Sequence, residues 1–277
     1  MTERERMPDA HVDYDRIAPT YDRRYAANTL EGIARALVAL VQEFGAARRS
    51  APRVLEVGCG TGRWLAALQA VTPHGYGLDR STGMLMQARR QSARFHLARG
   101  RAGRLPFPGG AFDVVYCVNA LHHFDQQRAF ISEARRLLRP GGALAVVGMD
   151  PRSVHRRWYV YRYFAGTYAT DLARFPSWGQ VLDWVIAAGF SDAAWRIVER
   201  VVDHKIGRAV LDDPFLDKAA TSQLALLSDE AYAAGWRRIE AALDEADAAG
   251  DTLVFPVDLP MGMLTAWCIG SPSGSRD

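Results

Sequence analysis

The chain has 277 residues, of which 49% are hydrophobic, so it can bury one large α/β core or a core with a substantial insertion. Its net charge at pH 7 is only +3, and arginine supplies nearly all of the positive charge. A balance this close to neutral argues against a general nucleic-acid binder.

Three scattered cysteines, Cys59, Cys117 and Cys268, argue against both a disulfide framework and a metal centre. No two of them form a C-x-x-C pair, so buried free thiols in a reducing cytoplasm are expected. The charged first residues lack the apolar segment of a signal peptide, and no run of about 18 apolar residues could span a bilayer. We therefore expect a cytoplasmic protein without stable membrane insertion.

The amino-terminal third begins with two predicted helical segments. The stretch from Tyr14 to Asp22 contains two Tyr-Asp pairs seven residues apart, which share one face of a helix. It fits an amphipathic helix on the surface. Residues 30–44 then carry apolar side chains at helical spacing, which predicts a helix that packs on a sheet.

Residues 54–62 combine a buried strand with a glycine-rich turn. The short apolar run closes with Glu56, and Gly58, Gly60 and Gly62 follow at every second position. A helical sequence begins at Arg63, so the glycines form a strand-to-helix turn against which a ligand can lie. The dinucleotide fingerprint G-x-G-x-x-G requires its third glycine where this chain has Arg63, which weakens the prediction of a dehydrogenase.

Four further motifs follow the turn in order. They are Tyr76-Gly77-Leu78-Asp79 with Ser81, Met84 and Leu85 beyond it; Leu105-Pro106-Phe107; Phe112-Asp113-Val114-Val115 leading to Leu121-His122-His123-Phe124; and Leu138-Arg139-Pro140-Gly141-Gly142. Together with the E-x-G-x-G-x-G turn, this series resembles the class I S-adenosylmethionine (SAM) dependent methyltransferases. The resemblance covers residues 14–148 well and is looser beyond them.

The resemblance implies S-adenosyl-L-methionine as the cofactor, held by residues at the carboxyl ends of the strands. Asp79 would accept hydrogen bonds from the ribose hydroxyls, although it would suit NAD as well. The segment at Tyr14 would be a cap over the cofactor, with Tyr21 beside the sulfonium. The expected cofactor-binding residues are Tyr14, Tyr21, Glu56, Gly58, Cys59, Gly60, Gly62, Asp79, Arg80, Met84, Arg101, Ala102 and Asn119.

The sequence departs from these relatives at Arg101. They usually carry Gly-Asp-Ala, whose Asp accepts a hydrogen bond from the adenine amino group, and this chain has Gly-Arg-Ala. Arginine has no acceptor to offer. Arg101 could stack on the adenine face or point away, which would leave the backbone around Ala102 to contact the ring.

A base for the methyl acceptor is expected at the ends of two neighbouring strands. His122 and His123 follow a predicted strand at 111–118, and Asp150 follows another at 143–149. A carboxylate beside an imidazole gives a general base near neutral pH. We predict His122, His123 and Asp150 as catalytic residues, without choosing between the histidines. The alternative is that the histidines only line the cofactor pocket.

The remainder of the chain adds two insertions to the sheet. Residues 152–168 interleave aromatic and basic side chains, which fits a lid over the active site, a helix packed between layers, a membrane-facing surface or a nucleic-acid surface. Residues 208–250 contain an amphipathic helix that begins at Ser228. Two separate strands are expected at 252–259 and 261–269, because Pro256 and Pro260 interrupt them.

These elements predict one α/β fold: a doubly wound, seven-stranded, mostly parallel sheet of the Rossmann-like methyltransferase type. Residues 1–50 would form an N-terminal helical cap and first helix, 51–150 the SAM-binding core, 151–270 the remaining sheet with acceptor-pocket insertions, and 271–277 a tail. The predicted function is transfer of a methyl group from SAM to an O, N or C nucleophile of a small molecule, with no nucleic-acid partner and no metal. The alternatives are an NAD(P)-dependent oxidoreductase and a SAM-binding protein without catalytic activity.

Overall fold

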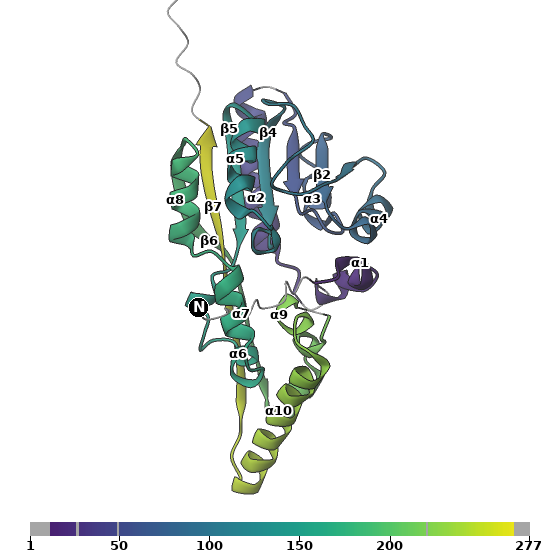
Figure 1. Ribbon diagram of the computed structural model, residues 1–277, viewed down its shortest axis with the longest axis vertical. Helices are drawn as coiled ribbons and strands as arrows, with labels where there is room; N and C mark the ends of the chain where they lie inside the picture. The colour runs from purple at the N-terminus through teal and green to yellow at the C-terminus, as the bar shows by residue number, and fades with distance from the viewer. Residues whose placement is uncertain (1–11, 26–27, 49, 220, 269–277) are drawn as a thin grey trace, which may run out of the picture.

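The computed structural model describes residues 12–25, 28–48, 50–219 and 221–268, and the tail expected at 271–277 lies outside them. Within these residues the seven strands form one sheet in the order β3-β2-β1-β4-β5-β7-β6 (Figure 1). Strands β1 to β5 are parallel, and β7 runs antiparallel between β5 and β6. The predicted fold is therefore confirmed. The strands are β1 (Val54–Val57), β2 (Gly75–Asp79), β3 (His96–Arg99), β4 (Phe112–Val118), β5 (Leu138–Gly148), β6 (Phe190–Ile206) and β7 (Val254–Cys268).

Helices cover both faces of this sheet because the central strands are apolar on both sides. In β4, Val114 and Tyr116 pack toward the helices of one face, while Val115 and Cys117 pack toward the other. This is the alternation expected of a strand between two layers. The first face is covered by α2 (Glu31–Arg48) and α3 (Arg63–Leu68), and the second by α5 (Gln127–Leu137) and α8 (Trp178–Ala187).

The carboxyl-terminal half extends beyond the sheet as an arm (Figure 1). Only Gly262–Trp267 of β7 pairs with β5, whereas β6 and β7 stay paired back to Ile206 and Val254. We define the arm as this outer part of β6 and β7, residues 201–206 and 254–261, with the helices packed around it. These helices are α6 (Tyr159–Tyr163), α7 (Thr167–Arg174), α9 (Ser222–Ala225) and α10 (Asp229–Ala249).

The expectation of two strands separated by prolines is wrong, because β7 is continuous through Pro256 and Pro260. The amide of Asp258 donates to the carbonyl of Arg157, on the side of β7 away from β6. Along a strand, the backbone N–H groups of every second residue point to the same side. Pro256 and Pro260 each lie two residues from Asp258, so their nitrogens also face away from β6. Their missing N–H groups therefore cost no ladder hydrogen bond.

The aromatic segment at 152–168 is mostly core of the arm. Tyr159 and Phe164 are 2% and 0% exposed. A Cβ at Gly235 of α10 would lie 2.2 Å from the ring of Phe164, which follows the last residue of α6. Only glycine therefore lets α10 approach this end of α6 so closely. Among these side chains, Trp158 lines a cavity described below. Packing between layers therefore accounts for most of this segment.

Candidate functional site

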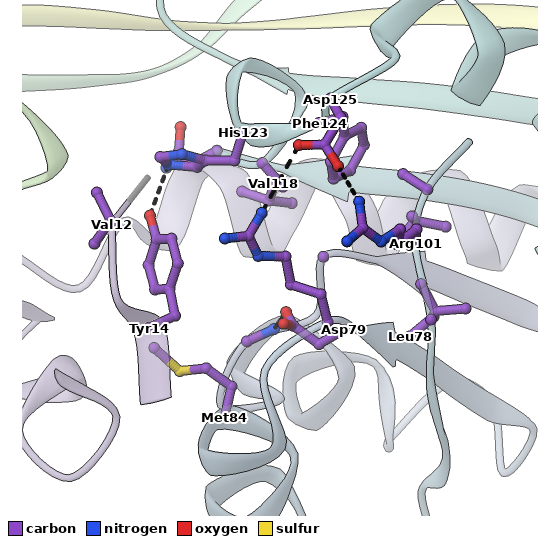
Figure 2. A pocket seen from close by; sticks show the side chains of 18 of the residues that line it. Val12, Tyr14, Leu78, Asp79, Met84, Arg101, Val118, His123, Phe124 and Asp125 are labelled. Carbon is purple, nitrogen blue, oxygen red and sulfur yellow. Dashed lines mark hydrogen bonds and ion pairs between the residues drawn. The ribbon is translucent and has the colours of Figure 1, made fainter. Parts of the chain in front are cut away.

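A cavity of about 790 Å³ opens at the carboxyl ends of β1, β2 and β4 (Figure 2). Its floor is the turn after β1, where Gly58 and Gly60 have φ of 75° and 51°. A Cβ at Gly58 would lie 2.6 Å from the Cβ of Ala120, whereas one at Gly60 would meet no atom within 4 Å. The turn thus presents bare backbone to the cavity. The predicted cofactor residues in its wall are Tyr14, Tyr21, Gly58, Gly60, Asp79, Arg80, Met84, Arg101, Ala102 and Asn119.

Three predicted cofactor residues do not line this cavity. Glu56 is fully buried, and the hydroxyl of Tyr116 donates to its Oε2 at 3.3 Å. Burial raises the pKa of Glu56 well above its usual value. Cys59 is buried as well, and Gly62 precedes the first residue of α3. These residues support the turn from behind, and their contact with a ligand stays a prediction.

Asp79 ends β2 and is fixed by the backbone around the cavity. The amide of Gly60 donates to its Oδ2 and the amide of Ser81 to its Oδ1, both at 2.9 Å. Burial raises the pKa of Asp79, and these backbone hydrogen bonds oppose that effect. The carboxylate still has acceptor capacity for a ligand, because each oxygen can accept more than one hydrogen bond.

The amino-terminal segment covers one side of the cavity with α1 (Tyr14–Ile17) and the 3₁₀ helix η1 (Tyr21–Tyr25). Asp15 accepts from the amide of Gly83 at 2.6 Å and from the hydroxyl of Ser81 at 2.8 Å. Asp22 accepts from the hydroxyl of Thr61 at 2.7 Å. In each Tyr-Asp pair the aspartate therefore docks the segment, while the tyrosine lines the cavity.

Arg101 lies at the rim of the cavity in an ion pair. Its guanidinium contacts Asp125 at 2.8 Å, and Arg80 lies 3.8 Å from the other oxygen of the same carboxylate (Figure 2). The Arg101 side chain is 81% exposed. Arg101 thus remains a lining residue that is paired with Asp125, another lining residue, while the neighbouring Ala102 is buried in the wall.

A second cavity of about 810 Å³ adjoins the first. The two cavities share four lining residues, Tyr14, Tyr21, Asn119 and His123. The other walls of the second cavity come from the amino-terminal segment, from the arm and from the segments leading into the arm. They are mainly apolar or aromatic and include Tyr25, Leu30, Met149, Trp158, Phe175, Val201, Phe215, Leu259 and Met261.

The two predicted histidines have different surroundings. The ring of His123 lies on the shared wall, with its Nε2 2.7 Å from the hydroxyl of Tyr14. His122 lines only the second cavity of the two and stacks on Phe175 with ring centroids 3.7 Å apart. Burial, followed by the charges of His123 and Arg174, lowers the pKa of His122 well below its usual value. His122 is therefore a neutral wall residue at neutral pH.

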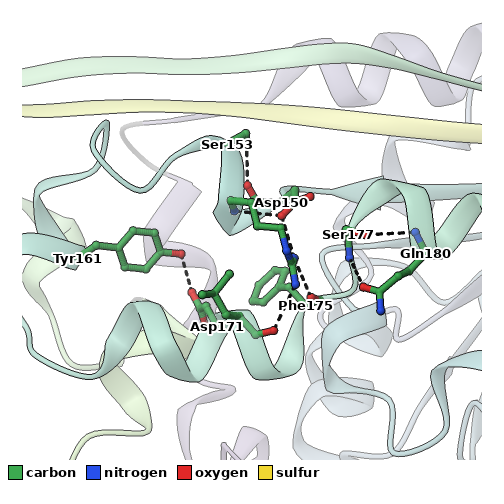
Figure 3. Close-up of polar contacts among 9 residues, drawn as sticks. Asp150, Ser153, Tyr161, Asp171, Phe175, Ser177 and Gln180 are labelled. Carbon is green, nitrogen blue, oxygen red and sulfur yellow. Dashed lines mark hydrogen bonds and ion pairs between the residues drawn. The ribbon is translucent and has the colours of Figure 1, made fainter.

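Asp150 is bound by residues that follow it in the chain, and its catalytic role beside the histidines stays a prediction. Its carboxylate accepts from the amide and the side chain of Arg152, each at 3.0 Å, and so caps the short helix Pro151–Ser153 (Figure 3). The side chain of Arg152 also donates to the carbonyl of Phe175. Asp150 thus holds the loop that carries Phe175, and the ring of His123 has Tyr14 as one hydrogen-bonding partner.

Several residues of the second cavity were not predicted as site residues. Arg24, Trp158, Phe175 and Gln223 lie far apart in the sequence, and no motif connects them. In the described part of the chain no group of three His, Cys, Asp or Glu side chains could hold a metal ion. None of the described helices is long and apolar enough to cross a bilayer.

Comparisons with known proteins support one family. Residues 55–146 match a family model described as a methyltransferase domain. A demethylmenaquinone methyltransferase of Beutenbergia cavernae is 30% identical over 161 residues, which cover 53% of this chain and 67% of that protein. A phthiotriol/phenolphthiotriol dimycocerosates methyltransferase of Mycobacterium leprae is 38% identical over 115 residues, or 40% of this chain, and the match spans 43% of that relative.

The fold also has solved counterparts. One is a phosphoethanolamine N-methyltransferase of Haemonchus contortus in complex with SAM, with a TM-score of 0.54 and 16% sequence identity. The match covers 93% of this chain and 57% of that one. At this level of identity the likeness concerns the fold alone.

Proposed function

The chain belongs to the class I SAM-dependent methyltransferases, and from this premise we propose that it methylates a small acceptor bound in the second cavity. SAM would occupy the first cavity. The observation that carries the proposal is the shared wall of Tyr14, Tyr21, Asn119 and His123, because a methyl group must pass directly from one ligand to the other.

The residues of the first cavity fit SAM. The bare backbone at Gly58 and Gly60 lets a ligand lie against the turn, and Asp79 offers a fixed carboxylate for the ribose hydroxyls. Tyr21 places an aromatic ring in the wall, a favourable neighbour for a sulfonium. Bound SAM would supply an electrophilic methyl group together with its own leaving group.

The chain's own part in the reaction is to orient the acceptor and to accept its proton. His123 is the side chain we assign as base, since it borders both cavities and Tyr14 holds its ring. A phenol stabilises a protonated imidazole less than the expected carboxylate of Asp150 would. The base therefore acts best on acceptors that lose their proton readily. His122, kept neutral by burial, shapes the pocket.

We assign the binding of SAM and the binding of the acceptor to different parts of the chain. Residues 51–150 would hold SAM, 151–270 would enclose the acceptor, and the segment before residue 50 would close over both. The names of the two curated relatives refer to demethylmenaquinone and to phthiotriol dimycocerosates. An apolar acceptor also suits the walls of the second cavity. We place the activity in the cytoplasm and assign it no nucleic-acid partner.

Mass spectrometry over a panel of acceptors tests this function. The protein is incubated with SAM and with phenols, enols, carboxylates and amines that carry apolar rings. We expect S-adenosylhomocysteine to form together with a product heavier by one CH₂ group. Formation of neither with any member, although SAM binds, would favour the SAM-binding protein without catalytic activity.

A further inference from the structure

The charged groups of the second cavity all have one sign. Among its described lining residues there is no aspartate or glutamate, and Arg24 is the one side chain with a permanent charge. His122 is kept neutral by burial, and an imidazole such as that of His123 can add only positive charge. The cavity is therefore electropositive within apolar walls, where charges interact more strongly than in water.

Arg24 lies close to the wall that the two cavities share. Its guanidinium carbon is 4.2 Å from the ring centroid of Tyr21 and 5.9 Å from that of Tyr25. Tyr21 lines both cavities, so Arg24 is next to the place where the acceptor would meet SAM. The two rings stack against the guanidinium, and its five N–H groups include more donors than a single bond to Tyr21 would use.

The nearby carboxylates are already engaged. Arg24 also lines a neighbouring cavity with Asp203 and Asp213. Asp203 is paired with Lys205 at 2.7 Å, and Asp213 accepts from the hydroxyl of Tyr159 at 2.9 Å. No salt bridge of Arg24 occurs among the described residues. A half-buried cation without a counter-charge favours a ligand that brings one.

Two neutral groups in the same wall also lack a partner. Trp158 and Thr221 are 2% and 7% exposed, and the indole Nε1 of Trp158 and the hydroxyl of Thr221 form no hydrogen bond with a described residue. Indole N–H is a donor only, and a hydroxyl can donate. Both groups therefore have a donor that an oxygen acceptor would satisfy.

We propose that the second cavity selects acceptors with an acidic oxygen, of the phenol or enol class, and that Arg24 binds this oxygen as its anion. A protonated amine would meet Arg24 without any carboxylate to balance its charge. The inference rests on the proposed function, which it narrows from O, N or C nucleophiles to ionisable oxygen.

The reaction that this proposal implies is methyl transfer from SAM to the acceptor oxygen. A neutral acceptor gives its O–H proton to His123. An acceptor that is ionised at neutral pH has already lost this proton to solvent before it binds. The oxygen then bonds to the methyl carbon as the bond from this carbon to sulfur breaks. Sulfur keeps the bonding pair, and the products are a methyl ether and S-adenosylhomocysteine.

The test uses 4-nitrophenol, which ionises near neutral pH and absorbs visible light only as the anion. The full chain is saturated with S-adenosylhomocysteine, and the absorbance of bound 4-nitrophenol is titrated against pH. We expect the pKa of the bound phenol to lie about one unit below that of the free phenol, which corresponds to about tenfold tighter binding of the anion than of the neutral form. Arg24→Met should abolish this difference, and Arg24→Lys should retain part of it.

Two controls keep the result interpretable. Arg23→Met removes an exposed arginine from the same 3₁₀ helix and should bind 4-nitrophenol as the unchanged chain does. The uncharged isostere 4-nitroaniline should bind equally to the unchanged chain and to Arg24→Met. Failure of 4-nitrophenol to bind the unchanged chain, or an equal pKa with and without Arg24, would overturn the inference. Failure of S-adenosylhomocysteine to bind would instead overturn the proposed function.

Discussion

The two cavities differ in what builds their walls. The first is made largely by the strand ends and the glycine turn within residues 55–146, the part of the chain that matches the methyltransferase domain. The second is made by side chains of the arm and the amino-terminal segment, most of which lie outside that match. Backbone geometry can serve one ligand in many proteins, whereas side chains adapt each protein to its own acceptor. The arm is therefore where the specificity of this chain should be sought.

The largest effect is expected where the two cavities meet. His123→Ala should lower turnover of a weakly acidic phenol roughly 10²–10⁴-fold, because the base that accepts its proton is lost. An acceptor that is already ionised, such as 4-nitrophenol, should suffer much less. Steady-state rates with the two acceptors check this. Equal losses with both would mean that His123 positions the ligands and does not act as a base, and His122→Ala serves as the matched variant.

The next effect should be confined to the first cavity. Asp79→Ala should weaken SAM binding by about 1–3 kcal/mol, since a charged hydrogen-bond acceptor is lost. Burial raises the pKa of Asp79, so this carboxylate becomes protonated at a higher pH than an exposed aspartate does. On acidification, SAM binding should therefore begin to weaken at that higher pH. Titration calorimetry from pH 7 downward measures both. Asp183→Ala, an exposed substitution in α8, should leave the affinity unchanged.

A smaller effect should appear in the segment that belongs to both cavities. Residues 14–25 are held by the carboxylates of Asp15 and Asp22, and few of their side chains are buried. Amide hydrogen exchange in this segment should slow when S-adenosylhomocysteine binds. Asp15→Asn should weaken that protection about fivefold, in line with the loss of roughly 1 kcal/mol from a charged hydrogen bond. Exchange that does not respond to the ligand would identify the segment as fixed packing.

The smallest effect concerns stability behind the first cavity. Burial raises the pKa of Glu56, so the folded chain holds the proton more tightly than the unfolded chain does, and stability falls as pH rises above about 4. Glu56→Gln should therefore raise the free energy of unfolding at pH 7 by about 1 kcal/mol, and this gain should vanish below pH 4.

Glu133 provides the opposite case on α5. Its hydrogen bonds with Arg136 lower its pKa, so its ionised form stabilises the fold above the unfolded pKa, and this contribution is lost on acidification. Glu133→Gln should lower stability at pH 7. Urea unfolding at several pH values compares the two variants, and a change of the same sign in both would contradict the assigned pKa directions.

The difference between the cavities also explains what the sequence could predict. The strand order, the glycine turn and Asp79 follow from local patterns, because a buried parallel strand and a turn of positive φ each restrict residue type. The extent of β7 was missed because a proline excludes a strand only when its nitrogen faces a partner. That orientation depends on pairing with β6, which is a tertiary property.

The residues that line the second cavity could not be predicted from local sequence patterns, because they too are brought together only by tertiary structure. Arg24 and Trp158 are more than a hundred residues apart in the sequence, and they line one cavity only because the arm folds back on the amino-terminal segment. Asp150 was easier to place. It follows the predicted strand as expected, whereas its ion pair with Arg152, two residues later, could not be predicted from the position of the strand end alone.

A crystal structure with S-adenosylhomocysteine and 4-nitrophenol tests the central claim most directly, namely that methyl transfer occurs across the wall between the two cavities. We expect S-adenosylhomocysteine over Gly58 and Gly60 with its ribose on Asp79, and the phenol in the second cavity with its oxygen beside Arg24. The sulfur and this oxygen should face each other between Tyr14, Tyr21, Asn119 and His123. A phenol bound elsewhere, or the two ligands separated by these side chains, would contradict the account.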